Sequence, residues 1–196
     1  MDLIARINQH FLDSMQAQEA ARELLAAPTA VAAERVVAAL MGDHKMLACG
    51  NGASAADAQH FAARMVSRFE KERPGLPAIA LTTDTSVLSA IADDYDFDLV
   101  FSKQVRAIGQ PGDVLLAFSP LGNSANVIEA IYAAHERQMT VIALTGADGG
   151  KITELLSGDD IQLNVPATRA ARIQEVHLLL IHSLCDAIDC ILLDGE

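Results

Sequence analysis

The chain has 196 residues, 51% of them hydrophobic and 20% charged, a composition typical of a globular protein with a sizeable core and not of a disordered one. Its net charge of −12 argues against broad binding to nucleic-acid phosphates and against attraction to anionic membranes. Three cysteines, an odd number in mostly apolar surroundings, favour free thiols in a reducing compartment. We find no secretory signal and no apolar run that approaches membrane-spanning length, so we expect a soluble, cytoplasmic protein without direct nucleic-acid or membrane contacts.

Two helices are expected before the first strand. Apolar residues recur at helical spacing over residues 1–27, and a second helix is expected to open at Pro28 and to run to about residue 40. The first helix carries apolar residues on more than one side, which suits packing on a neighbouring subunit or within the chain itself. We assign residues 1–41 to oligomerisation and residues 42–196 to an α/β core, within a single domain over residues 1–196.

The first strand and the turn after it organise the rest of the chain. Residues 45–49 are a short apolar run, and residues 50–54 follow as Gly-Asn-Gly-Ala-Ser, with Ser54 expected to cap the next helix. The two glycines allow backbone conformations that other residues avoid. Such a turn places backbone N–H groups and a helix N-terminus at the carboxyl end of a strand, which suits a phosphate. An ordinary tight turn is the alternative.

Four further apolar runs alternate with helical segments and predict the other strands, at residues 77–81, 113–118, 140–144 and 161–165. A long last helix is expected over about residues 169–192. This alternation predicts a five-stranded parallel sheet with helices on both faces, a three-layer α/β sandwich. Hydroxyl residues or glycines follow four of the five strands, where such sheets bind ligands, so we expect a polar crevice for a phosphate. The alternative is that these residues only cap the following helices.

Several short motifs, taken in order, carry a resemblance to a known family. They are GNGASAADAQHF at 50–61, ALTTD at 80–84, GDVL at 112–115, GNS at 122–124, ALTG at 143–146 and RIQEVH at 172–177. With them the chain resembles the SIS (sugar isomerase) domain family, which has a flavodoxin-like fold, and within it the phosphoheptose isomerases and their sister group, the DnaA initiator-associating proteins. The resemblance implies a homotetramer with active sites between subunits. It also implies conversion of sedoheptulose 7-phosphate to a heptose 7-phosphate, a step in lipopolysaccharide biosynthesis.

The resemblance also assigns roles to single residues. His182 matches the last-helix histidine that transfers the proton in catalysis, and Gln174 shares roughly one face of that helix with it, since eight residues make little more than two turns. His60, Gln174 and His182 match the groups that hold zinc in some members. The residues that match substrate-binding positions are Asn51, Gly52, Ser54, Arg68, Asp94, Ser119, Asn123, Ser124 and Gln174.

The chain departs from the family pattern where the chemistry is expected. Arg64 stands where the isomerases carry the catalytic glutamate, and a guanidinium neither accepts a proton at usable pH nor suits a metal cation beside His60. In the phosphate loop, Pro120 and Leu121 replace two hydroxyl residues, and Pro120 also lacks a backbone N–H. We expect weakened sugar-phosphate binding, little or no isomerase turnover, and no zinc.

Two functions from different classes follow from the resemblance. The first is an isomerase with lowered activity, in which His182 is the remaining acid–base group. The second is a non-catalytic scaffold that resembles the DnaA initiator-associating protein and assists replication initiation through protein contacts, for which an acidic surface is no obstacle. His60 and Arg64 lie one helical turn apart, and the alternative interpretation is that they only form part of a solvated polar face of the helix. His177 is expected to pack in the interior or at an interface.

Overall fold

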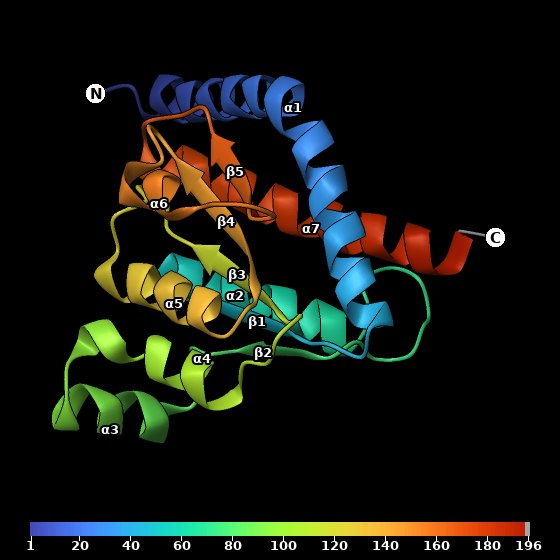
Figure 1. Ribbon diagram of the computed structural model, residues 1–196. Coiled ribbons are helices and arrows are strands. Elements are labelled where there is room, and N and C mark those ends of the chain that lie inside the picture. Colours follow the sequence, from blue (N-terminus) through green and yellow to red (C-terminus); the bar gives the residue numbers. More distant parts are fainter. Residues whose placement is uncertain (195–196) are drawn as a thin grey trace.

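The protein is described here from a computed structural model over residues 1–194 (Figure 1). Its centre is a five-stranded parallel sheet with the strand order β2-β1-β3-β4-β5. The strands are β1 (Met46–Gly50), β2 (Ala78–Ala80), β3 (Val114–Phe118), β4 (Thr140–Gly146) and β5 (Ile161–Val165). The predicted α/β fold with five parallel strands is confirmed, and this strand order is that of flavodoxin-like sheets.

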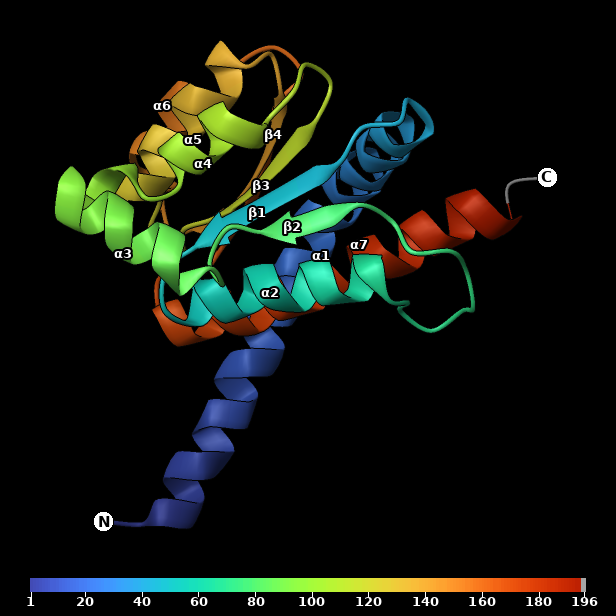
Figure 2. The same cartoon turned by 90° about the horizontal axis from the view of Figure 1, so that it is seen from below.

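Helices cover both faces of the sheet. The helices on one face are α1 (Leu3–Met41), α2 (Ala53–Val66) and α7 (Ala170–Asp194). Those on the other face are α3 (Thr85–Asp94), α4 (Ser102–Ile108), α5 (Ala125–Glu136) and α6 (Gly150–Leu155), with a 3-10 turn, η1 (Phe97–Leu99), before α4. Figure 2 shows α2 and α7 side by side against the sheet, and the first half of α1 projecting beyond it.

The strands divide their residues between two separate cores. In β3, Leu116 belongs to the core formed with α1, α2 and α7, whereas Leu115 and Ala117 belong to the core formed with α4 and α5. Every residue of β1 and β3 is buried. A strand that is buried on both faces needs apolar residues at successive positions, which explains why the strands are visible in the sequence as short apolar runs.

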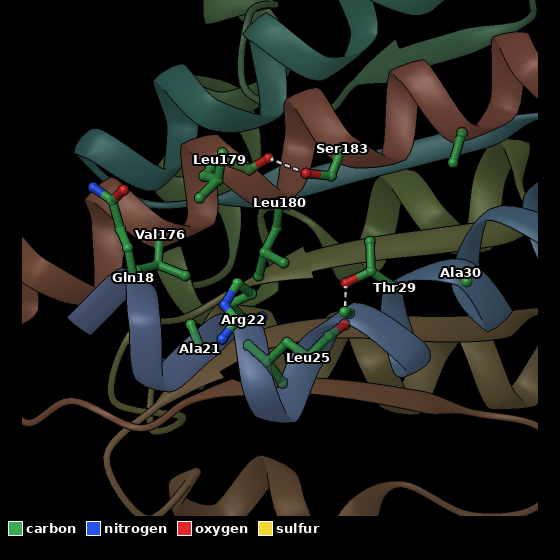
Figure 3. A pocket seen from close by; sticks show the side chains of 12 residues that line it. Gln18, Ala21, Arg22, Leu25, Thr29, Ala30, Val176, Leu179, Leu180 and Ser183 are labelled. Carbon is green, nitrogen blue, oxygen red and sulfur yellow. Dashed lines mark hydrogen bonds between the residues drawn. The ribbon is translucent and has the colours of Figure 1, made fainter. Parts of the chain in front are cut away.

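The helix α1 is continuous over 39 residues, so the prediction of two helices that meet at Pro28 is wrong. A proline inside a helix removes one backbone hydrogen bond and bends the helix, but neighbouring groups can preserve the helical path. Here the Thr29 hydroxyl donates a 2.6 Å hydrogen bond to the Leu25 carbonyl (Figure 3). Figure 1 shows the resulting bend in α1.

Two helices, α1 and α7, are long and apolar enough to cross a membrane by length and composition alone. The prediction that no apolar segment reaches this length is therefore wrong. In the structure, 39% and 44% of the residues in their most apolar windows are buried within the protein. Because core helices of globular proteins have the same length and composition, this finding is only weak support for a membrane span.

The cysteines are free thiols, as expected. Cys49 and Cys185 are buried and Cys190 is partly buried. Burial raises the pKa of Cys49 and of Cys185 to about 12, so neither is a reactive thiolate at neutral pH.

Candidate functional site

The turn after β1 depends on two glycines. Gly52 has a φ of +57° and is the N-cap of α2, while a Cβ added at Gly50 would lie 2.8 Å from the Ser54 carbonyl oxygen. The prediction that Ser54 is the N-cap is wrong, because the chain turns two residues earlier and α2 begins at Ala53. The Ser54 hydroxyl is instead buried, without a hydrogen-bond partner among the described residues.

The side chain of Asn51 in this turn pairs with Asn126 in the first turn of α5. Asn51 Nδ2 donates to Asn126 Oδ1 at 2.7 Å, and Asn126 Nδ2 donates to Asn51 Oδ1 at 2.9 Å. Asn126 is only 2% exposed, so the pair is a buried link between the turn after β1 and the helix that follows β3. Sequence reasoning missed Asn126, because its partner lies 75 positions away and is near it only through the pairing of β1 with β3.

The two predicted phosphate-binding hydroxyls meet in the loop after β3. Ser119 Oγ donates to Ser124 Oγ at 3.1 Å, and the Ser124 backbone N–H donates to Ser119 Oγ at 3.4 Å. Ser119 is buried and Ser124 is partly buried at the start of α5. Since β1 and β3 are neighbours in the sheet, these hydroxyls share its carboxyl edge with Asn51, as the sequence predicts.

The Asn123 amide is used within the fold. It donates to the Leu121 carbonyl at 2.8 Å and accepts from the Lys151 backbone N–H at 3.1 Å, which ties the loop to the start of α6. The side chain of Leu121, which replaces a hydroxyl residue of the family loop, is 50% exposed at this edge. The loop is therefore tied within the fold and presents an apolar side chain at a position where the resemblance implies a hydroxyl residue.

The helices α2 and α7 bring together two histidines that are 122 positions apart. His60 Nε2 and His182 Nε2 lie 2.9 Å apart, so one ring N–H donates to the unprotonated nitrogen of the other ring. The ring of Phe69 lies beside His182, with centroids 5.5 Å apart. This contact brings together two predicted site residues from two different helices.

Arg64 lies one helical turn beyond His60, and its side chain is exposed. Burial lowers the pKa of His60, and the charges of Arg64 and His182 lower it further. The neutral form of His60 is therefore favoured, in agreement with a hydrogen bond that needs one ring nitrogen without a proton.

A buried ion pair fixes the end of α2 beside α7. Arg73 donates through Nε to the Asp189 carboxylate, and both side chains are almost fully buried. The remaining N–H groups of Arg73 donate to the backbone carbonyls of Met65 at 2.9 Å and of Arg64 at 3.0 Å. The backbone at position 64 is therefore held in place by charge-assisted hydrogen bonds.

Three other predicted residues form no hydrogen bond or ion pair with this group within residues 1–194. Arg68 pairs with Glu72 at 3.4 Å on the exposed surface. Asp94 ends α3 and is exposed, and Gln174 is partly buried in the first third of α7.

Comparison with known proteins identifies the family. Residues 10–146 match the SIS domain family. The chain is 66% identical to the phosphoheptose isomerases of Laribacter hongkongensis and of Azoarcus sp., over the whole length of all three chains. The solved phosphoheptose isomerase of Neisseria gonorrhoeae is 59% identical with a TM-score of 0.91, covering 95% of this chain and 98% of that one. That of Francisella tularensis is 43% identical with a TM-score of 0.94, covering 96% and 99%.

The chain belongs to the SIS domain family, among the phosphoheptose isomerases.

The three zinc ligands that the family resemblance implies, His60, Gln174 and His182, do not fit one ion within one protomer. Gln174 and His182 are eight residues apart on α7, which is about 12 Å along the helix axis, whereas neighbouring donor atoms on a tetrahedral zinc ion lie about 3.4 Å apart. His60 and His182 bond to each other, and one turn along α2 from His60 lies the cation Arg64. Within residues 1–194, no three His, Cys, Asp or Glu side chains are placed to hold a metal ion.

Burial shifts the pKa of two further titratable groups, one on α2 and one on α7. Asp57, one turn before His60 on α2, was not predicted from the sequence; burial raises its pKa to about 6. His177 on α7 is fully buried, which agrees with a packing role, and its Nε2 N–H donates to the Thr145 carbonyl at 3.0 Å. Burial lowers the pKa of His177 to about 4, although the bond to Thr145 opposes the shift.

The low pKa of His177 predicts a loss of stability in acid. An unfolded histidine has a pKa of about 6.5, so the unfolded chain takes up the proton first and stability falls as the pH drops from about 6.5 towards 4. The full effect is about 3 kcal/mol. We expect His177→Gln, which keeps an N–H for the Thr145 carbonyl, to flatten this part of the curve of unfolding free energy against pH. Urea unfolding of both proteins across this range measures the difference, and parallel curves would rule out His177 as the source.

Proposed function

We propose that the chain is a sugar-phosphate-binding phosphoheptose isomerase homologue in which isomerase turnover is weak or lost. The sugar-phosphate part is supported by family membership. The loss of turnover is supported by one observation above all, the groups that surround His182. Its imidazole is bonded to His60, and the neighbouring position on α2 carries the permanent cation Arg64 and no carboxylate.

The phosphate is proposed to bind at the carboxyl edge of the sheet, between the turn at residues 50–54 and the loop at residues 119–124. Asn51, Gly52 and Ser54 supply one side, and Ser119, Asn123 and Ser124 the other. Backbone N–H groups at the start of a helix favour an anion, but Pro120 and Leu121 remove donors from this loop and weaken the binding. The proposed contacts to the sugar itself are Arg68, Asp94 and Gln174.

Isomerisation of a sugar phosphate moves a proton between adjacent carbons, so it needs a group that accepts the proton and returns it near neutral pH. Arg64 cannot do this, because a guanidinium stays protonated. His182 is the remaining acid–base group, but its Nε2 must first be released from His60. Both features lower the expected rate of proton transfer.

A coupled assay with sedoheptulose 7-phosphate tests this proposal. We expect turnover below roughly 0.1 s⁻¹, about a hundredfold under the median of ordinary enzymes. Turnover near that median would refute the loss of catalysis and leave His182 as a competent base in the presence of Arg64.

Arg64→Glu is expected to create a zinc site. The carboxylate would join His60 one turn away and His182 across the helices, giving three protein ligands and a position for water. Calorimetric titration with zinc should show stoichiometric binding to this variant and much weaker binding to the unaltered protein. Arg64→Gln is the matched control, since it removes the cation without adding a ligand. An Arg64→Glu protein that binds no zinc would show that the side chain at position 64 does not meet the histidines.

We also propose assembly into a homotetramer through residues 1–41. The first half of α1 exposes a set of apolar side chains, namely Leu3, Ile4, Ile7, Phe11, Leu12 and Met15. A groove of about 320 Å³ with mainly apolar lining lies between α1 and α7 (Figure 3). None of the predicted ligand-binding residues lines this groove. An exposed apolar surface without ligand-binding residues favours contact with another subunit over binding of a sugar phosphate.

The second candidate function is the non-catalytic scaffold for the replication initiator DnaA, in the same cytoplasmic compartment. Arg64 favours this candidate, because a site can lose its proton acceptor while the fold and the assembly are kept. A scaffold role predicts that the immobilised protein captures purified DnaA at micromolar concentration. An empty pull-down under these conditions would remove this candidate.

A further inference from the structure

Within residues 1–194, Arg64 is a cation without an ion-pair partner, in a strongly acidic protein with a net charge of −12. The other arginines near the end of α2 are neutralised, Arg68 by Glu72 and Arg73 by Asp189. The Arg64 guanidinium, in contrast, forms no hydrogen bond or ion pair within residues 1–194. A guanidinium that the fold leaves unneutralised offers its planar set of N–H donors to an anion from outside.

The Arg64 guanidinium is near enough to His60 for its charge to help lower the pKa of that imidazole, after burial. Helical side chains lean toward the N-terminus of their helix, so Arg64 leans back toward His60. Its charge also opposes the rise in the pKa of Cys185, which follows His182 on α7 by three residues, so it lies near that helix as well. The Arg64 carbonyl accepts from Arg73 at 3.0 Å, which holds this end of α2 in place.

The surrounding groups do not neutralise Arg64. His60 and His182 share one hydrogen bond, and neither imidazole supplies a negative charge. The acid on this helix, Asp57, lies seven residues before Arg64, about 10 Å along the axis, and forms no ion pair with it in the described chain. Where a base or a metal ion would act on a sugar, this site presents a cation.

We propose, resting on the sugar-phosphate function above, that the ligand is a phosphorylated sugar acid, with its phosphate at the loops and its carboxylate at Arg64. From Ser54 to Arg64, α2 rises about 15 Å, and the Arg64 side chain that leans back toward His60 covers about 6 Å of it. The remaining span of about 9 Å is one that an extended six- or seven-carbon sugar phosphate covers. The carboxylate would receive two N–H groups of the guanidinium side by side. A ketose phosphate has only a neutral end to place there.

Calorimetric titration with 6-phosphogluconate and with fructose 6-phosphate tests the proposal, because these six-carbon compounds differ in whether the far end is a carboxylate. We expect the acid to bind at least about tenfold more tightly, as for a hydrogen bond to a charged group. Arg64→Gln should abolish the preference without changing the affinity for fructose 6-phosphate. Arg64→Lys, which keeps the charge but not the planar fork, should retain part of it.

Arg106→Gln is the matched control, since it removes the same charge from an exposed pair with Glu136 on the far face of the sheet. Its preference for the acid should equal that of the unaltered protein. Equal affinity of the unaltered protein for both compounds would overturn this inference and leave the sugar-phosphate function standing. A preference that survives Arg64→Gln would overturn the role of Arg64. Binding of neither compound would overturn the sugar-phosphate function and this inference with it.

Discussion

The contact between α2 and α7 is the constraint on which the site depends. Both helices lie on one face of the sheet because its strands are buried on both sides and send alternate residues into that core. The histidine pair and the buried Arg73–Asp189 pair lock the two helices together at two levels. Sliding α2 by one turn would break the histidine pair and the hydrogen bonds from Arg73 to the Met65 and Arg64 carbonyls, and buried N–H groups of a charged side chain without partners are costly. The positions of His60, Arg64 and His182 are therefore consequences of the core.

In our proposal, one side chain then determines which ligands this contact favours. A carboxylate at position 64 would join two imidazoles and favour a cation or a proton transfer, whereas a guanidinium favours an anion. The fold remains that of the phosphoheptose isomerases, with a TM-score of 0.91 at 59% identity to the Neisseria gonorrhoeae enzyme. The proposed chemistry is separable from the fold, because Arg64 is an exposed side chain that the core does not need.

The fold was predictable from the sequence because strands such as β3 are apolar at every position, and the loops of a parallel sheet must meet at one edge. Pro28 was misjudged because Thr29 and the surrounding core keep α1 helical through the bend. The N-cap at Gly52 was missed because serine is the more frequent N-cap residue, whereas here the chain turns at a glycine with a φ of +57°. The Asn51–Asn126 and His60–His182 pairs could not be predicted as pairs, since they require the strand order and the crossing of two helices.

The ring nitrogens of His60 and His182 give the most direct test of this account. Nitrogen-15 NMR of the histidine side chains at neutral pH reports which ring nitrogens carry protons. The account predicts one Nε2 protonated and the other unprotonated, with both signals unchanged when equimolar zinc is added. A zinc-induced shift of both Nε2 signals would contradict it, because it would show that the two rings separate to hold a metal ion beside Arg64.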